Sequence, residues 1–195
     1  MFPPFNDCSQ DDIDRLVGEF PLAWVVTRDF NATLLPLLAE RGEDGRIASF
    51  LGHCGRRNHI VGDLRADPAA LILFQGPSGY ISNRIVSEPD WGPTWNYAAV
   101  RFLVDIEWVE EETPAAVDRL LDHMDGPEDQ RWTPKELGAR YHGMVERIIA
   151  FRAHVREVRP TFKLGQDESP PIFAEIVSRH GDRQLAAWME ALARE

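Results

Sequence analysis

The chain has 195 residues and a net charge of −11, with 21 Lys and Arg residues against 32 Asp and Glu residues. Hydrophobic residues make up 44% of the sequence, including six Trp and ten Phe, which is enough for a substantial core and excludes wholesale disorder. The acidic balance argues against a large basic face for the nucleic-acid backbone, because such binding depends on Lys and Arg.

The sequence favours a cytoplasmic protein without a membrane span or a metal site. Its apolar runs are far too short to cross a bilayer, and its first residues lack the basic start of a signal peptide. The two cysteines, Cys8 and Cys54, do not form a disulfide framework, and no metal-ligand spacing surrounds them. The length fits one domain with a small helical appendage, and we place their boundary between 1–167 and 168–195.

The first half of the chain predicts a helix followed by strands. Apolar residues recur at helical spacing from Ile13 to Phe20, and Ser9 can cap this helix. Strands are predicted at 22–27, 33–38, 46–53 and 70–75, with a hairpin turn at 42–45 and a short helix at 58–64.

The second half predicts two long or alternating strands and several helices. Strands are expected at 96–110 and 151–156, and helices are expected after Thr113, after Thr133 and from Ser169 to Glu195, with a break at Gly181. About six strands with inserted and appended helices predict an α+β fold built on a small antiparallel barrel.

Charge is unevenly spread along this second half. Acidic residues dominate 105–129, whereas basic residues dominate 140–163. We interpret the two segments as a mixed, solvated surface.

Three separated stretches have the composition of one ligand site. They are 74–82 (FQGPSGYIS), 93–97 (PTWNY) and 163–166 (KLGQ). Each combines aromatic or glycine positions with amide and hydroxyl side chains, which suits the faces and edge of a flat ligand rich in heteroatoms. At 52–58 (GHCGRRN), two adjacent guanidinium groups lie at a predicted turn and are suited to gripping a phosphate. A ring with a phosphate indicates a nucleotide-like cofactor, and the residues alone do not say which one.

Taken together and in this order, these stretches resemble the PaiB-type family of FMN-binding negative transcriptional regulators, which belongs to the FMN-binding split β-barrels. The resemblance runs from about Phe20 to Gln166. It implies a six-stranded antiparallel split β-barrel in the main domain, a homodimer, and FMN in a groove at the subunit interface.

The resemblance also implies roles for particular residues. Arg56 and Arg57 would hold the phosphate, Gln75 and Ser82 would meet the pyrimidine edge of the flavin, and Lys163 would serve either the phosphate or the ring. The full set of expected cofactor-binding residues is Leu35, Pro36, His53, Arg56, Arg57, Asn58, Gln75, Ser82, Thr94, Trp95, Asn96, Lys163 and Gln166. Some of them have structural alternatives: Arg56 and Arg57 can form a solvated basic turn, Trp95 can be a core residue, and Lys163 can be a surface lysine. Gln75 and Ser82 can cap backbone groups at strand ends.

Several positions depart from the family pattern, including Leu34 and Arg101, where the family has histidines. The scaffold is kept while the polar lining of the site has changed. We expect a flavin-dependent redox or flavin-sensing role, and no side chain is identified as catalytic. The alternatives are a transcriptional regulator without enzymatic activity, or a barrel that binds or degrades haem. No tight, direct DNA binding is expected, because no basic recognition helix is present.

Overall fold

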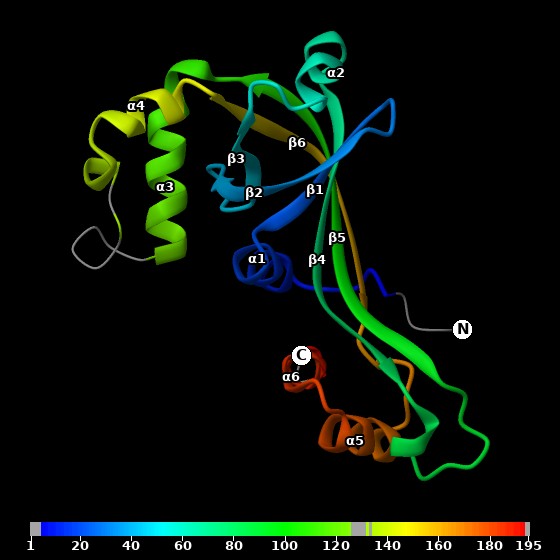
Figure 1. Ribbon diagram of the computed structural model, residues 1–195. Coiled ribbons are helices and arrows are strands. Elements are labelled where there is room, and N and C mark those ends of the chain that lie inside the picture. The colour runs from blue at the N-terminus through cyan, green and yellow to red at the C-terminus, as the bar shows by residue number, and fades with distance from the viewer. Residues whose placement is uncertain (1–4, 126–131, 133, 194–195) are drawn as a thin grey trace. The chain divides into compact units, whose positions relative to one another are not determined.

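The computed structural model describes residues 5–125, 132 and 134–193 (Figure 1). Within them, six strands close into an antiparallel barrel in the order β1-β2-β3-β6-β5-β4. The strands are β1 Leu22–Thr27, β2 Ala32–Arg41, β3 Ile47–Gly55, β4 Ala69–Ile81, β5 Thr94–Trp108 and β6 Ile148–Lys163. The longer helices are α1 Gln10–Glu19, α2 Ile60–Ala66, α3 Thr113–Asp125, α4 Ala139–Val145, α5 Pro170–Arg179 and α6 Arg183–Leu192. The predicted six-stranded barrel with inserted and C-terminal helices is therefore confirmed.

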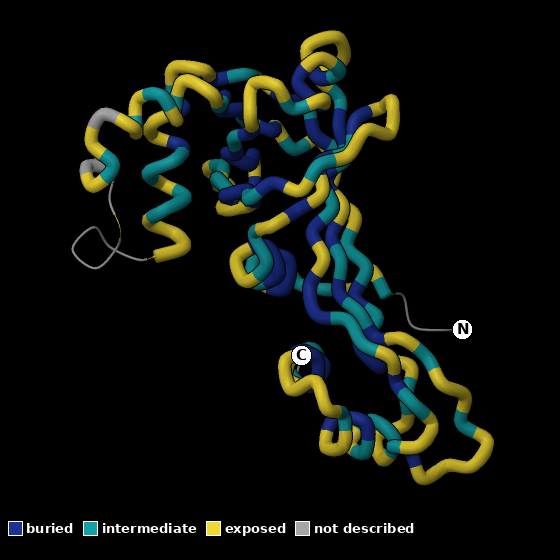
Figure 2. Tube along the Cα trace, viewed as in Figure 1, coloured by how far each residue is buried: buried dark blue, intermediate teal, exposed yellow. Residues whose placement is uncertain are grey.

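The chain divides into two compact units. The first unit contains 1–20, 74–101 and 159–195, and the second contains 21–73 and 102–158. Strands β4, β5 and β6 contribute residues to both units. Along most of β1, β4 and β5, buried residues alternate with more exposed ones, which is the period expected of strands with one face on a core (Figure 2).

The second unit has an aromatic core inside its strands. Phe50 of β3 and Phe102 of β5 are fully buried and meet edge to face, with ring centroids 4.8 Å apart. Gly52 is required here, since a Cβ atom on it would lie 2.5 Å from Leu37 and 2.7 Å from Phe151. The glycine at position 52 thus serves core packing rather than close approach to a ligand.

An ion-pair cluster joins helix α3 to the strands of the second unit. Arg119 of α3 and Arg152 of β6 both pair with Glu40 of β2, each at 2.7 Å. Arg152 also pairs with Glu112 at 2.8 Å. Two further side-chain contacts link β6 to β5: Arg156 pairs with Asp105, and His154 contacts Glu107. The acidic and basic segments of the sequence therefore pair with each other on one surface.

The first unit is built around Trp188 of α6. This side chain is 2% exposed, stacks against Phe162 at 6.2 Å, and donates from Nε1 to Glu19 of α1 at 3.0 Å. The guanidinium of Arg15 lies 4.1 Å from the indole ring. Residues of α1, β6 and α6 thereby share one core. Ser9 caps α1 through a capping box with Asp12, as the sequence predicts.

The end of β4 was predicted wrongly. The Gly-Pro-Ser-Gly run at 76–79 is typical of a turn, and the strand was expected to end at Gln75, but β4 continues to Ile81. The two glycines instead allow close packing in the first unit. A Cβ on Gly76 would lie 3.1 Å from Leu16 of α1, and one on Gly79 would lie 2.8 Å from Leu185 of α6.

Other differences are smaller. The helix expected after Thr133 is a short 3-10 turn, η3 Pro134–Leu137, followed by α4, and Gly138 between them has a φ of 53°. Thr133, the expected cap, lies outside the described residues. Helices α5 and α6 are separated at the predicted break, and Asp182 caps α6 by accepting from Gln184 and Leu185.

Candidate functional site

A cluster of three arginines surrounds the turn after β3 in the second unit. The turn is joined to the start of β6 by a backbone hydrogen bond from Arg56 N to Arg147 O at 2.8 Å. Together with Gly55, Arg57, Asn58 and Glu146, these residues line a cavity of about 530 Å³. Arginine side chains are suited to a phosphate, which they can bind through charge-assisted hydrogen bonds.

The three arginines are not equally available. Arg56 donates from Nε to the Glu146 carbonyl at 3.0 Å and pairs through Nη1 with Glu110 at 2.6 Å. Arg57 and Arg147 are exposed, and neither side chain forms an ion pair or hydrogen bond with another residue in the described part of the chain. The most available donors are therefore Arg57 and Arg147. Arg147 was not among the expected site residues, because only the tertiary fold brings position 147 to the turn.

The other expected residues of the second unit mostly have structural partners. Asn58 donates to Thr33 Oγ1 at 3.2 Å and accepts from the backbone of Ile60, so it shapes the turn. His53 is half-buried, and burial lowers its pKa, so it is neutral at pH 7 and adds no charge to the cavity. Leu35 is 7% exposed and lies on the inner face of β2, whereas Pro36 lies on the outer face, opposite Leu22.

In the first unit, the ends of β4, β5 and β6 bring together aromatic rings and a lysine. Trp95 is 58% exposed and Tyr80 is 49% exposed, with ring centroids 5.8 Å apart. Lys163 donates from Nζ to Thr94 Oγ1 and, at 3.2 Å, to the Trp95 carbonyl. Exposed aromatic faces next to an ammonium group are suited to a flat, electron-accepting ring. Trp95 is thus not a core residue.

The amide and hydroxyl residues of the first unit have partners within the fold. Gln166 donates to Phe162 O and accepts from Leu164 N, so it closes the turn after β6. Asn96 is 2% exposed and donates to Met189 Sδ at 3.5 Å. Ser82 accepts from Arg84 N, and Gln75 donates to Ser78 Oγ at 3.3 Å. The hydroxyl of Ser82 therefore caps a backbone group, which is the structural alternative stated for it.

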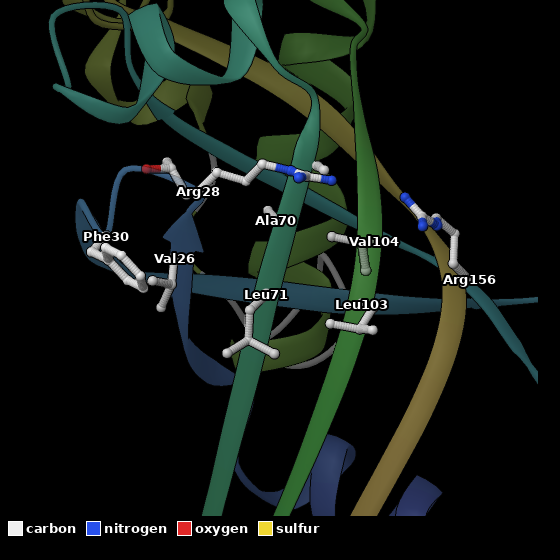
Figure 3. Close-up of a pocket in the computed structure, with 10 residues that line it drawn as sticks. Val26, Arg28, Phe30, Ala70, Leu71, Leu103, Val104 and Arg156 are labelled. Atoms are coloured by element: carbon white, nitrogen blue, oxygen red, sulfur yellow. The ribbon is translucent and has the colours of Figure 1, made fainter.

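The sequence did not indicate a groove on the outside of the second unit (Figure 3). Its volume is about 380 Å³, and Val26, Leu71 and Leu103 from three strands line its floor. Arg28 and Arg156 also line it, but each pairs with a carboxylate at 3.0 Å, Asp67 and Asp105 respectively. The groove is therefore mainly apolar and close to neutral, which makes it unsuited to a phosphate.

Neither a metal site nor a membrane span is found in the described part of the chain. No three His, Cys, Asp or Glu side chains within 5–125, 132 and 134–193 are grouped so that they could hold a metal ion. Among the same residues, no helix combines the length and apolar character needed to span a bilayer.

Comparison with known proteins identifies the family. Residues 1–157 match the model of the family described as "Putative FMN-binding domain". The chain belongs to this FMN-binding family. A relative in Bacillus subtilis (strain 168), "Protease synthase and sporulation protein PAI 2", is 26% identical over 184 residues, covering 90% of this chain and 86% of the relative. The resemblance to the PaiB type is thereby confirmed, and FMN is the cofactor of the family.

Two solved structures share the fold. The flavocytochrome Anf3 from Azotobacter vinelandii aligns with a TM-score of 0.60 at 12% identity, covering 79% of this chain and 67% of that chain. The FAD and heme binding protein from Mycobacterium smegmatis aligns with a TM-score of 0.57 at 16% identity, covering 89% of this chain and 78% of that chain.

The residues present fit the two chemical parts of FMN. Arg57 and Arg147 offer unpaired guanidinium donors for a phosphate dianion. Tyr80 and Trp95 offer exposed ring faces for the isoalloxazine, and Lys163 offers a positive charge next to them. The arginines belong to the second unit, and the aromatic pair with Lys163 belongs to the first.

Proposed function

We propose that this protein is a cytoplasmic, homodimeric FMN-binding protein with a flavin-dependent redox or flavin-sensing role. The observation that carries the proposal is the cavity at the turn after β3, where two exposed arginines have no partner among the described residues. Cations left unpaired at a cavity are suited to an external anion. FMN supplies the electron-transfer chemistry when bound, and the chain supplies binding and orientation.

The phosphate is assigned to Arg57 and Arg147, with Arg56 as a third and partly occupied donor. This assignment modifies the sequence-based expectation, in which Arg56 and Arg57 were the pair. Within the first unit, the exposed rings of Trp95 and Tyr80 are suited to an isoalloxazine, and a positive charge such as that of Lys163 favours a reduced, anionic flavin. Thr94 positions the Lys163 ammonium rather than contacting the ring.

An apolar surface supports the homodimer. The outer face of β1, β2 and β4 in the second unit carries Leu22, Trp24, Val26, Leu34, Pro36, Leu71 and Leu73. Trp24 lies directly opposite Leu34 on one side and Leu73 on the other, so the apolar residues are contiguous across three strands. Trp24, Leu22 and Leu34 are 41%, 55% and 43% exposed. Contiguous exposed apolar patches of this kind mark interfaces.

The groove of Figure 3 extends the same outer face, because Val26 and Leu71 belong to both. At its edge, Phe30 is 88% exposed and has a φ of 63°, which is unusual for a bulky side chain. A second copy of the chain would cover this apolar surface. We expect a C2 interface that buries more than about 1,000 Å².

Substitution of the arginines tests the assignment of the phosphate. FMN affinity should fall in the variants Arg57→Ala and Arg147→Ala, and by at least about tenfold when both are combined. The reason is that each charge-assisted hydrogen bond contributes roughly 1.5–3 kcal/mol before solvent screening. Riboflavin, which lacks the phosphate, should bind nearly unchanged. The control is Arg46→Ala, which removes one exposed guanidinium outside the cavity. Equal losses for FMN and riboflavin would show that the arginines are structural.

A regulatory role is the alternative. The Bacillus subtilis relative is named "Protease synthase and sporulation protein PAI 2". A transcriptional regulator of this family would bind flavin without turning it over. Flavin reduction by NADH or NADPH in the presence of candidate electron acceptors distinguishes the two roles. Catalytic turnover supports the redox role, and a bound flavin that is not turned over supports the regulatory role.

A further inference from the structure

Two of the three guanidinium nitrogens of Arg56 already have partners. Its side-on edge is made of Nε and Nη2, and Nε already donates to the Glu146 carbonyl at 3.0 Å. The end-on edge is made of Nη1 and Nη2, which together can bind two oxygens of a phosphate. Nη1, however, already pairs with Glu110 Oε2 at 2.6 Å. The carboxylate of Glu110 therefore engages one of the two nitrogens that a phosphate would need for an end-on, two-oxygen contact with Arg56.

Glu110 is held in this place by further contacts. Its other oxygen, Oε1, pairs with Arg65 of α2 at 3.2 Å. Its backbone carbonyl accepts from Thr113 Oγ1 at 2.7 Å, which fixes η2 (Glu110–Glu112) at the start of α3. The hydrogen bond from Arg56, followed by the charges of Arg56 and Arg65, holds the pKa of Glu110 below its ordinary value, so the carboxylate stays charged at neutral pH.

We propose that Glu110 is an internal competitor for the phosphate: its carboxylate engages Nη1 of Arg56 and thereby lowers the affinity of the turn for phosphate-bearing ligands. The inference rests on the proposed function, because it assumes that the ligand's phosphate binds at this turn. It assigns to Glu110 a specificity-determining role and explains why Arg56 is paired while Arg57 and Arg147 are not.

This arrangement has a physical consequence for selectivity. An anion that binds Arg56 through both Nη1 and Nη2 must displace the Glu110 carboxylate or share Nη1 with it, and both cost affinity. Free phosphate has no other contacts to offset this cost, whereas FMN also has its ring contacts. Glu110 thus keeps the cavity clear of free phosphate, which would otherwise compete with FMN.

The test compares two variants of Glu110 with a matched control. Glu110→Gln removes the charge, and Glu110→Ala also removes the hydrogen-bonding group. The control Glu111→Gln removes the same charge from the neighbouring residue of η2, which is exposed and makes no hydrogen bond or ion pair with another residue that the structure describes. Equilibrium dialysis measures the affinity for FMN and riboflavin, and inorganic phosphate is titrated as a competitor of FMN.

Both Glu110 variants should bind FMN about two- to fivefold more tightly, the range expected for an exposed ion pair, while riboflavin affinity stays unchanged. Inorganic phosphate should become a better competitor in the same variants. Lower FMN affinity would overturn the inference, since Glu110 would then orient Arg56 for binding. A gain equal to that of Glu111→Gln, or an equal gain for riboflavin, would overturn it too.

The affinity of the wild-type protein separates failure of this inference from failure of the proposed function. If the wild type does not bind FMN more tightly than riboflavin, the turn does not hold the phosphate, and both fail. If the wild type prefers FMN and the Glu110 variants gain nothing, only the inference about Glu110 fails.

Discussion

Glu40 is expected to make the second unit sensitive to acid. Burial alone would raise the pKa of its carboxyl, but hydrogen bonds from Arg152, Arg119 and Ser49 outweigh burial and lower the pKa from 4.5 to about 2. The side chain is 19% exposed, so solvent screens these interactions only in part. A pKa difference of this size between the unfolded and folded states contributes at most roughly 3 kcal/mol to the free energy of unfolding at neutral pH.

The sign of the pH dependence follows from the lowered pKa. The stability that the Glu40 carboxylate contributes is fully present above about pH 4.5, where Glu40 is also charged in the unfolded chain. It is lost as the pH falls towards 2. In Glu40→Gln, the free energy of unfolding at pH 7 should therefore fall by about 2–3 kcal/mol. Between pH 5 and 3, the variant should lose stability less steeply than the wild type.

Urea unfolding followed by circular dichroism, at pH steps from 7 to 3, measures both effects. Glu43→Gln is the matched control, because Glu43 is exposed in the hairpin turn and has no hydrogen bond or ion pair in the described part of the chain. If Glu40→Gln and the wild type lost stability in parallel between pH 5 and 3, the ion pairs of Glu40 would not stabilise the fold and the reasoning would be wrong.

Three further predictions concern the cofactor and the partners. The purified or FMN-reconstituted protein should show flavin absorbance with quenched fluorescence, and Trp95→Leu should restore part of the fluorescence; a Soret band instead would identify haem. The double variant Trp24→Lys with Leu34→Lys should be a monomer in light scattering at micromolar concentration, whereas the control Met124→Lys, at an exposed position on α3, should remain a dimer. A dimer that survives the double substitution would exclude this interface. Gel shifts at physiological salt should show no nanomolar binding to genomic DNA fragments, because the net charge is −11; a tight, specific shift would favour the regulator role.

Local patterns predicted most of the strands. The strand-like run from Leu22 to Thr27 predicted β1 with its observed bounds, and Gly42 to Gly45 predicted the hairpin between β2 and β3. The predicted strand at 70–75 stopped short of the glycine-rich run at 76–79, which β4 includes. Glycine serves close packing as well as turns, and only the neighbouring side chains in the fold distinguish the two uses. The domain boundary at 167 stays a prediction.

The candidate site was less accessible to sequence reasoning. Arg56 and Arg57 are adjacent in sequence, so their shared turn was predictable, but their pairing state was not. Arg147 joins them from 90 residues away through the pairing of β3 with β6, and Glu110 reaches Arg56 from the end of β5. Single residues such as Asn96 and Gln166 show the same limit, because an amide side chain has the same sequence pattern whether it binds a ligand or closes its own loop.

The order of strands in the barrel has a consequence for folding. Strand β6 is the last strand in the chain, yet it lies between β3 and β5, and Ser49 pairs with His154 across more than half of the sequence. The barrel therefore cannot close during synthesis until β6 has left the ribosome, and the edges of β3 and β5 stay open until then. Contacts so distant in sequence slow folding. The insertion of β6 between β3 and β5 is therefore the folding step on which chaperones, or truncation of the chain before β6, would have their largest effect.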